Sequence, residues 1–276
     1  MRLMRAAFIV TLLSVIAVGL TIKFKSGAHA FRFNEGGQNK TFTVDGVERT
    51  AIIYANTEAA PKAGVPVVFF FHGHGGNSRN IDRRYQLNTL WREAVCVYPQ
   101  GLTGVQGITD PEGKKTGWQK NPGELGDRDV KFFDAMLAGL QKAYRIDMNR
   151  IYVMGHSNGG RFVNVLWKMR GEQLAAICSV AGQGGLMIQN AVPKSIFMIA
   201  GERDPLVPFE GQKRSMDVVR KVLKTDSTKA KTEGLMTTEP GTNGTELVTY
   251  LHPGGHEFPQ ETLPAIISFF KRHPKA

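Results

Sequence analysis

The stretch Arg150-Ile-Tyr-Val-Met-Gly-His-Ser-Asn-Gly-Gly-Arg161 decides the fold of this chain. Its β-branched and aromatic run at 151–153 predicts a buried strand, and an apolar run with helical spacing follows at 162–166. Between the two lies a turn of the form G-x-S-x-G at 155–159. A serine at such a strand–turn–helix junction has its hydroxyl exposed above the sheet edge, so we predict that Ser157 is a nucleophile.

The first thirty residues have the layout of an export signal. Two arginines precede an uncharged, mostly apolar run at 6–22, and Ala28-His29-Ala30 offers a small-x-small cleavage site. Two lysines between the run and this site also fit an uncleaved anchor. We therefore expect residues 1–30 to be a signal peptide or an N-terminal membrane anchor. The protein would be secreted or periplasmic, or anchored facing outside, with residues 31–276 as a single domain.

The basic charge of the chain is partly a property of this leader. Without the four cations of residues 1–30 the formal charge of +11 falls to +7. The remaining basic residues are scattered along the chain, and they are densest at 213–231, in a predicted surface helix and loop. No aromatic residues or nucleic-acid motif accompany it. We expect no nucleic-acid partner, contact with a membrane only through the N-terminal segment, and a monomer.

Apolar runs of strand length recur through the domain. An Asp-Gly turn at 45–46 joins two alternating segments into a hairpin. The continuous apolar run at 65–71 is typical of a strand that is covered on both faces, and similar runs recur at 94–98, 151–154, 175–180, 195–200 and 247–251. Helical periodicities lie between them. This alternation predicts an α/β domain with a mostly parallel sheet that helices cover on both faces.

The working site of such a sheet lies beyond the carboxyl ends of its strands. The strand at 65–71 is followed there by His-Gly-His-Gly-Gly-Asn at 72–77. Backbone N–H groups that point at a developing oxyanion lower the barrier to acyl transfer. We assign one such donor to the amide of His74, with Gly75 as a close second. The other is the amide of Asn158, the residue after the nucleophile.

A serine nucleophile needs a base to take its proton and a carboxylate to orient that base. The strand at 195–200 is followed by Asp204, which is our candidate acid. Glu202 is the alternative, and a surface Arg–Asp pair without a catalytic role would be the simpler interpretation. The last strand leads to His256 on a Gly-Gly loop, from which the imidazole can reach Ser157. The histidines show no metal-ligand spacing, so we expect neither a metal nor a cofactor.

The chain order Ser157, Asp204, His256 is the order of an α/β-hydrolase. Several motifs together resemble the esterase family of polyhydroxybutyrate depolymerases and bacterial feruloyl esterases: Val-Asp-Gly-Val-Glu-Arg at 44–49, His-Gly-His-Gly-Gly at 72–76, Val-Tyr-Pro at 97–99, Asp-Val at 129–130, the turn at 155–160, and Gly-His at 255–256. The likeness runs from about Thr41 to the last helix. The Ser-Asn-Gly-Gly form of the turn is more similar to the feruloyl-esterase branch.

This resemblance implies a serine carboxylic-ester hydrolase that works through an acyl-enzyme. Its substrate would be a feruloyl-type ester or a hydroxyalkanoate oligomer, possibly borne on a polymer. A serine peptidase of the prolyl-oligopeptidase type could use the same three residues, and an inactive hydrolase fold could serve as a binding protein. Labelling of Ser157 by a fluorophosphonate would separate either enzyme from the binding protein.

The resemblance also implies an eight-stranded sheet in the order 1-2-4-3-5-6-7-8. Cys96 and Cys178 would then lie three strand spacings, or about 14 Å, apart. Because a disulfide needs Cα atoms within about 7 Å, we predict two buried free thiols.

Two connections bear on the substrate. The loop at 100–126 is long and rich in Gly and Pro, and long loops are usually functional. We interpret Trp118, with Gln119, as a wall of the acyl or aromatic pocket; the alternative is that Trp118 only anchors the loop. The connection at 181–193 is too short for a lid domain, which predicts an open cleft. We expect Asp129 to cap the helix that follows it.

Overall fold

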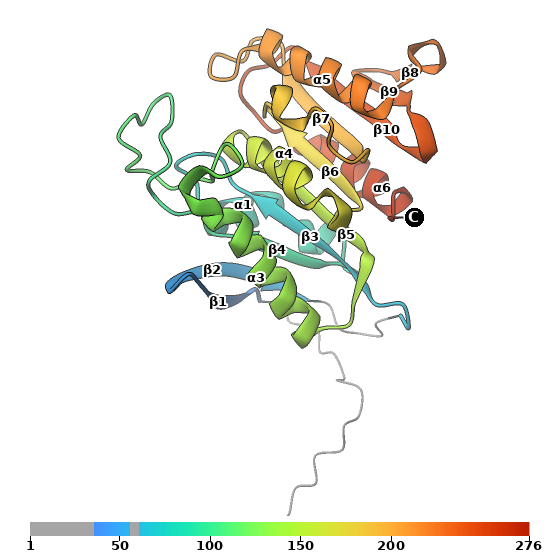
Figure 1. Cartoon of the computed structure of the whole chain (residues 1–276). Helices are drawn as coiled ribbons and strands as arrows, with labels where there is room; N and C mark the ends of the chain where they lie inside the picture. Colours follow the sequence, from blue (N-terminus) through green and yellow to red (C-terminus); the bar gives the residue numbers. More distant parts are fainter. Residues whose placement is uncertain (1–35, 56–60, 276) are drawn as a thin grey trace, which may run out of the picture.

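The computed structural model describes residues 36–55 and 61–275, and the predicted leader lies outside them. Ten strands in this part of the chain form one sheet between layers of helices (Figure 1). In spatial order the strands are β1 (Gln38–Val44), β2 (Val47–Tyr54), β4 (Val95–Pro99), β3 (Val65–Phe71), β5 (Ile146–His156), β6 (Ala176–Val180), β7 (Ser195–Gly201), β10 (Glu246–His252), β9 (Met236–Pro240) and β8 (Lys231–Glu233). The eight expected strands occur in the expected order, and β9 and β8 extend the sheet beyond them.

The strands from β4 to β10 run parallel, and antiparallel strands flank them at both edges. Every residue of β3 is buried, as its unbroken apolar sequence predicts for a strand covered on two faces. The edge strand β8 is instead a fully exposed Lys-Thr-Glu. Such short, charged edges oppose pairing with other chains, and they carry no apolar signal. The sequence therefore gave no indication of the β8–β9 hairpin.

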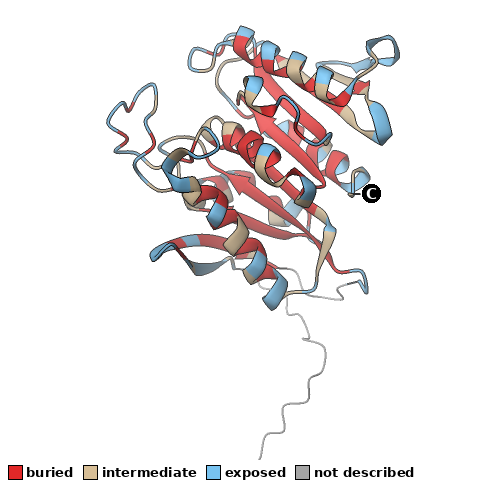
Figure 2. Ribbon diagram, viewed as in Figure 1, coloured by how far each residue is buried: buried red, intermediate tan, exposed pale blue. Residues whose placement is uncertain are grey.

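The helices divide between the two faces of the sheet. One face carries α3 (Arg128–Ala143), α4 (Asn158–Arg170) and α5 (Phe209–Leu223); the other carries α1 (Ser78–Tyr85), α2 (Leu87–Leu90) and α6 (Leu263–Arg272). Side chains of β3 alternate between the two cores, with Phe69 in one and Phe70 in the other. Figure 2 shows the buried residues concentrated in the strands and on the inner sides of the helices. Short 3₁₀ turns occupy η1 (Glu124–Asp127), η2 (Gly171–Gln173), η3 (Gly185–Ile188), η4 (Ser227–Lys229), η5 (Thr242–Gly244) and η6 (Gln260–Thr262).

The two cysteines are buried free thiols, as predicted. Cys96 lies on β4 and Cys178 on β6, with β3 and β5 between them. Burial raises the pKa of both thiols far above its usual range. Neither cysteine is therefore a nucleophile near neutral pH.

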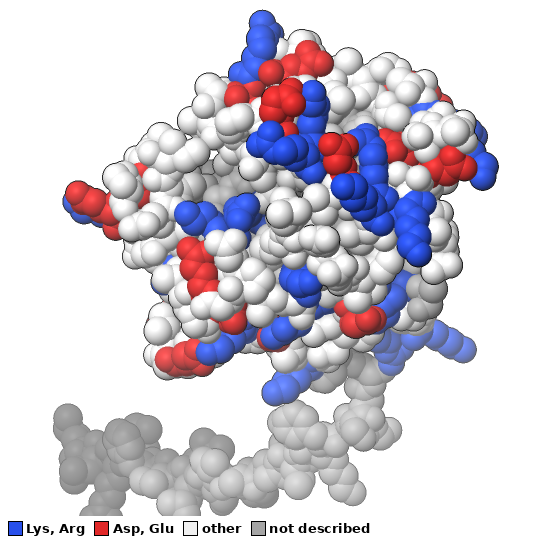
Figure 3. Space-filling view, turned by 45° about the horizontal axis from the view of Figure 1, so that its top comes forward, with Lys and Arg blue, Asp and Glu red and all other residues white. Residues whose placement is uncertain are grey.

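Charged side chains of both signs are interspersed on the face that Figure 3 shows. Several lysines and arginines pair with a carboxylate three residues away, among them Lys213 with Glu210 and Arg220 with Asp217.

In the described part of the chain, no helix combines the length and the apolar character needed to cross a membrane.

Candidate active site

Ser157 lies at the tight turn between β5 and α4. Its φ of 58° and ψ of −118° are a strained combination for an L-residue. The turn is tight enough that a Cβ at Gly155 would lie 2.3 Å from the carbonyl oxygen of Gly159, and a Cβ at Gly159 would lie 2.2 Å from that of Phe71. Only glycine fits at these two positions. The sequence of the turn thus forces the strand and the helix together and leaves the serine at its apex.

Two loops at the carboxyl edge of the sheet bring a histidine and a carboxylate to this serine. Ser157 Oγ lies 2.7 Å from His256 Nε2, on the loop after β10. His256 Nδ1 lies 2.8 Å from Asp204 Oδ2, on the loop after β7. In this geometry an imidazole can accept the serine proton while a carboxylate fixes its orientation. The structure thus brings together the three residues that we expected, and the alternative acid, Glu202, is exposed to solvent.

The surroundings of Asp204 keep its carboxylate ionised. The amides of Leu206 and Val207 donate to Oδ1, and Gln212 Nε2 donates to Oδ2. Burial alone would raise the pKa of Asp204, but the hydrogen bonds from Val207, His256 and Leu206 outweigh it and leave the pKa below its usual value. A permanent negative charge therefore faces Nδ1 of the histidine.

A second histidine, His156, packs against the first. The ring centroids of His156 and His256 are 5.0 Å apart. Burial, with smaller effects from His256 and Arg84, lowers the pKa of His156 to about 3. Its Nε2 is buried and has no hydrogen-bond partner among the described residues. His156 is therefore neutral at physiological pH and does not oppose a positive charge on His256.

Two backbone amides beside the serine are available for an oxyanion. A Cβ at Gly73 would lie 3.3 Å from the Cβ of Ser157, which places the 72–76 loop against the nucleophile. Within the described residues the amide of His74 has no partner, and Asn158 is the first residue of α4, where amides have no helical acceptor. The amide of Gly75 instead donates to the Thr116 carbonyl at 2.7 Å. The prediction for Gly75 is therefore wrong, because its N–H group is already used.

Side-chain contacts hold the 72–76 loop in place. His74 Nε2 lies 3.0 Å from Asp110 Oδ2, and Asp110 also accepts from the amides of Lys114 and Lys115. His72 Nε2 accepts from the Gly101 amide at 2.9 Å. Burial lowers the pKa of His72 to about 4, so it remains a neutral acceptor. Both histidines thus attach the 72–76 loop to the long loop at 100–126.

Trp118 and Gln119 do not contact the cleft, and their prediction as a wall of the pocket is wrong. Both are fully buried. The Trp118 ring stacks on Phe162, and its indole N–H donates to the His72 carbonyl at 2.8 Å. Its backbone amide and carbonyl pair with the side-chain amide of Asn158. Both residues anchor the loop, which is the alternative that we left open for Trp118; periodicity cannot reveal which way a loop aromatic faces.

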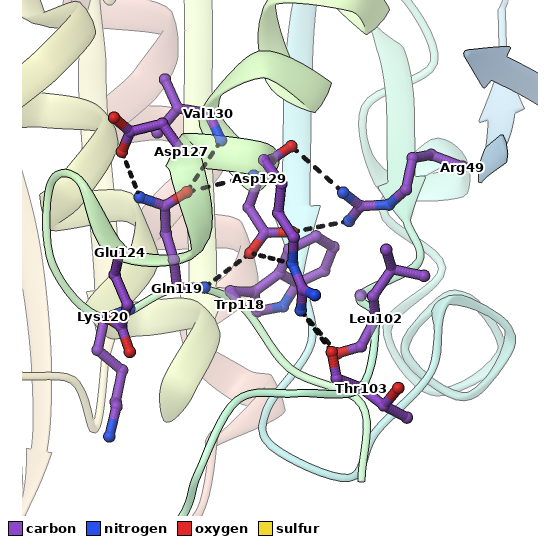
Figure 4. Close-up of polar contacts among 12 residues, drawn as sticks. Arg49, Leu102, Thr103, Trp118, Gln119, Lys120, Glu124, Asp127, Asp129 and Val130 are labelled. Carbon is purple, nitrogen blue, oxygen red and sulfur yellow. Dashed lines mark hydrogen bonds and ion pairs between the residues drawn. The ribbon is translucent and has the colours of Figure 1, made fainter. Parts of the chain in front are cut away.

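Figure 4 shows the polar network that surrounds Gln119. Gln119 Nε2 donates to Asp127, its Oε1 accepts from the amide of Asp129, and its own amide donates to the Asp129 carboxylate. That carboxylate forms an ion pair of 2.8 Å with Arg49, and both side chains are at most 1% exposed. Asp129 is therefore not the helix cap that we expected, because α3 begins one residue earlier.

The cleft over Ser157 has a volume of about 620 Å³. Its lining includes apolar side chains (Ile81, Tyr85, Ile108, Leu206, Phe258) and cationic ones (Arg84, Lys120, Arg161). Ile108 is 80% exposed and Leu206 40%. The connection between β6 and β7 contains only η3, so the described chain inserts no lid domain there. Sequence reasoning found the part of this lining that belongs to the motifs at 72–77 and 155–159, together with His256. It missed the rest, because those residues come from loops and from one helix face without a shared motif.

Comparison with curated proteins relates the chain to esterases. A stretch of 156 residues, 54% of the chain, is 30% identical to the candidate esterase NocK of Nocardia uniformis subsp. tsuyamanensis and covers 42% of it. Another stretch of 175 residues, 60% of the chain, is 27% identical to the bifunctional acetylxylan esterase/xylanase XynS20E of Neocallimastix patriciarum and covers 23% of that protein. A third, 52% of the chain, is 29% identical to a candidate feruloyl esterase C of Aspergillus clavatus and covers 50%. The chain thus spans half or less of the length of these relatives. No protein-family model matches it.

Solved structures identify the fold. An acetyl xylan esterase from Aspergillus awamori superposes with a TM-score of 0.66 at 14% identity, over 85% of this chain and 99% of that one. A ferulic acid esterase superposes with a TM-score of 0.63 at 14% identity, over 87% and 99%. At these identities the likeness shows the fold alone, and the chain has an α/β-hydrolase fold.

Proposed function

We propose that this chain is a serine carboxylic-ester hydrolase. The observation that carries the proposal is the hydrogen-bonded series from Ser157 Oγ through His256 to Asp204, with bond lengths of 2.7 and 2.8 Å. Beside this series lie the amide of His74, on the 72–76 loop, and the amide of Asn158, at the start of α4, and neither has an acceptor among the described residues. The names of the curated relatives, which are esterases, support the same reaction class.

In the proposed acylation step, Ser157 Oγ attacks the ester carbonyl while His256 Nε2 takes its proton. The anionic carboxylate of Asp204 stabilises the imidazolium that forms. The two free amides donate to the carbonyl oxygen as it becomes negatively charged. His256 then gives the proton to the departing alcohol, and the acyl group remains on Ser157.

Deacylation repeats these roles with water as the nucleophile. His256 Nε2 takes a proton from water, which attacks the acyl carbonyl, and returns the proton to Ser157 Oγ as the acid leaves. Ser157 lines the cleft and is partly exposed, so water and a bulky alcohol can reach it. The proposed chemistry uses only protons that the ester, water and the protein supply.

For the substrate we propose an acetyl or feruloyl ester borne on a polysaccharide, or a hydroxyalkanoate oligomer. The cleft without a lid domain fits an ester that is displayed on a polymer. The names of two relatives, an acetylxylan esterase and a feruloyl esterase, favour the first two. Rates on acetylated xylan, methyl ferulate and a hydroxybutyrate trimer, measured side by side, would rank the three.

A fluorophosphonate probe tests the reaction class directly. We expect the probe to label Ser157 of the wild-type protein, with loss of 4-nitrophenyl acetate hydrolysis in proportion to labelling. The Ser157→Ala variant should be neither labelled nor active, while its circular dichroism spectrum is unchanged. Hydrolysis that persists in Ser157→Ala would contradict the proposal.

We also propose that the protein is secreted or periplasmic. The support is the arginine-flanked apolar run at 6–22 and the Ala-His-Ala site at 28–30. Sequencing the N-terminus of the exported protein tests it: a start at Phe31 indicates cleavage, and a retained leader in the membrane fraction indicates an anchor.

A further inference from the structure

The charged side chains that line the cleft are mostly cations. Arg84, Lys120 and Arg161 line it, whereas Glu257 is the sole Asp or Glu among the described lining residues. The Glu257 carboxylate lies 3.4 Å from His252 Nδ1 and is 55% exposed. In the described part of the chain, none of the three cations has a carboxylate within ion-pair distance. Cations thus outnumber carboxylates in the lining of the cleft, and the described residues form no ion pair with them.

Of these three cations, Arg161 makes the most side-chain hydrogen bonds with described residues. It lies one helical turn after the nucleophile, and its amide donates to the Ser157 carbonyl. Its guanidinium is held by three neutral oxygens: the carbonyl of Lys120 at Nε (2.8 Å), the carbonyl of Gln183 at Nη1 (2.9 Å), and Asn121 Oδ1 at Nη2 (2.9 Å). Three of its five N–H groups are used in this way, and the other two have no partner among the described residues, so a ligand can use them.

For a side chain with only a structural role, this arrangement would cost desolvation free energy without an ion pair to offset it. Arg161 is partly buried, and burial lowers its pKa despite the more distant carboxylate of Glu124. A neutral glutamine could make hydrogen bonds to carbonyls without the desolvation of an unpaired charge. A rigid guanidinium that lacks an anion is, however, well prepared to bind one, because little side-chain entropy remains to be lost.

Lys120 adds a second cation to the same wall of the cleft. Its carbonyl accepts from Arg161, and its amide donates to Glu124 Oε2 at 2.6 Å. The Glu124 carboxylate is therefore occupied by backbone amides, including that of Asn121 at 2.9 Å. In Figure 4 the Lys120 side chain extends away from the Arg49–Asp129 ion pair. Its ammonium group remains available to a molecule in the cleft.

We propose that Arg161 and Lys120 form a carboxylate-binding subsite beside Ser157, and that the preferred esters carry a carboxylate in their acyl or alcohol part. The inference rests on the proposed esterase function and narrows its substrate class. Two N–H groups of a fixed guanidinium match the two oxygens of a carboxylate, and the lysine supplies a second positive charge. A uronic acid unit on a polysaccharide or a free carboxyl on the acyl chain would supply this anion.

Matched pairs of esters test the subsite. For the acyl part, 4-nitrophenyl hemisuccinate is compared with 4-nitrophenyl pentanoate, which has a similar length and no charge. For the alcohol part, 4-acetoxybenzoate is compared with 4-acetoxybenzamide. In at least one pair we expect kcat/KM to be about tenfold higher for the anion at low salt, as one charge-assisted hydrogen bond would give. The preference should decrease in 0.5 M NaCl.

Two variants and a control connect this preference to the subsite. Lys120→Gln and Arg161→Lys should each reduce the anionic-to-neutral ratio of kcat/KM by about threefold or more. Lys142→Gln, which removes the same charge from an exposed position on α3, should change neither rate. A thermal melt checks the fold of Arg161→Lys. If that variant unfolds, Lys120→Gln still decides the test, because the described neighbours of Lys120 form hydrogen bonds only with its backbone.

The outcomes separate the two proposals. Neutral esters that are hydrolysed as fast as their anionic partners in both pairs would overturn the subsite and leave the esterase intact. A preference that survives in both variants would also overturn it. Failure to hydrolyse any of the four esters would overturn the esterase function itself, and the subsite with it.

Discussion

Two polar networks of this protein each contain a buried carboxylate, but their chemistry differs. The sealed network consists of Arg49, Gln119 and Asp129; the open site consists of Ser157, Asp204 and His256. The carboxylates of Asp129 and Asp204 are both 0% exposed. Asp129 faces an arginine, whose charge is permanent, whereas Asp204 faces a histidine, which can gain and lose a proton.

The difference shows how burial alone fails to identify a functional carboxylate. Asp129 is hydrogen-bonded to Arg49 and to the Gln119 amide, and all of these groups are enclosed (Figure 4). The hydrogen bonds of Asp204 lead instead through a 13% exposed imidazole to a serine in the cleft. A functional carboxylate is thus identified by a titratable partner and by a path to the cleft. This contrast predicts that damage to the open site removes activity, and that damage to the sealed network removes stability.

The largest expected effect is on activity at the open site. Asp204→Asn keeps the shape of the side chain but removes the charge and disturbs the tautomer of His256. We expect kcat to fall by about 10³- to 10⁴-fold. The melting temperature should change by no more than a few degrees. Steady-state hydrolysis of 4-nitrophenyl acetate, alongside a thermal melt, measures both; activity within tenfold of wild type would mean that Asp204 does not orient the base.

In the sealed network the same replacement should act on stability. Asp129→Asn leaves the Arg49 charge buried and unpaired, which costs about 3–5 kcal/mol in the free energy of unfolding. Chemical denaturation measures this loss, and fluorophosphonate titration gives the number of intact sites. The rate per labelled site should remain near that of the wild type. A large fall in this rate would mean that the network also shapes the active site.

A double variant sharpens the comparison. Arg49→Met with Asp129→Leu replaces both charges by apolar groups of similar size, and such exchanges are often neutral or stabilising. We expect the double variant to recover most of the stability that Asp129→Asn loses. If it remains as unstable as the single variant, the geometry of the ion pair, rather than the unpaired charge, accounts for the loss.

Stability should also depend on pH through two neutral histidines beside the open site. Burial lowers the folded-state pKa of His72 to about 4 and of His156 to about 3, whereas an unfolded histidine titrates near 6.5. Between these values the unfolded state binds more protons, so stability falls as the pH decreases below 6.5. From pH 6.5 to 5 each histidine should contribute a loss of about 1.6 kcal/mol.

The variant His156→Gln tests this assignment. Because the Nε2 of His156 has no hydrogen-bond partner among the described residues, the replacement breaks no contact at that atom. Denaturation curves at pH 6.5 and 5 should show a loss about 1.6 kcal/mol smaller for the variant than for wild type. An equal loss in both proteins would mean that His156 is already protonated or that it titrates normally.

The sequence predicted the parts of this molecule in which residue type determines position. No residue larger than glycine fits at positions 155 and 159, so the turn around Ser157 could be recognised from the sequence alone. The order of the central strands followed from the resemblance and agrees with the structure. The triad residues could be nominated because strand ends share one edge of a parallel sheet.

Other features depended on contacts between distant segments, which no local pattern reveals. Trp118 is held by His72 and Asn158, each 40 or more positions away. The amide of Gly75 donates to the Thr116 carbonyl. The glycine-rich motif at 72–76 could not reveal this contact, so Gly75 was wrongly predicted as an oxyanion donor. Arg49 lies 80 positions from Asp129, and its pairing was therefore missed. The hairpin β8–β9 lacks an apolar face and gave no signal.

The smallest predicted effect lies beside the open site, at the 72–76 loop that carries the amide of His74. Asp110 contacts the His74 ring at 3.0 Å and accepts two backbone amides, so it positions this loop without reaching the substrate. Asp110→Asn keeps one of the two acceptor oxygens but removes the other and the charge, which should cost about 1 kcal/mol in transition-state stabilisation, or roughly fivefold in kcat. KM should change little, because the amide of His74 acts on the developing oxyanion rather than on the bound ester. A rise in KM with unchanged kcat would instead place Asp110 in substrate binding, and no change in either would show that the remaining contacts of the loop are sufficient.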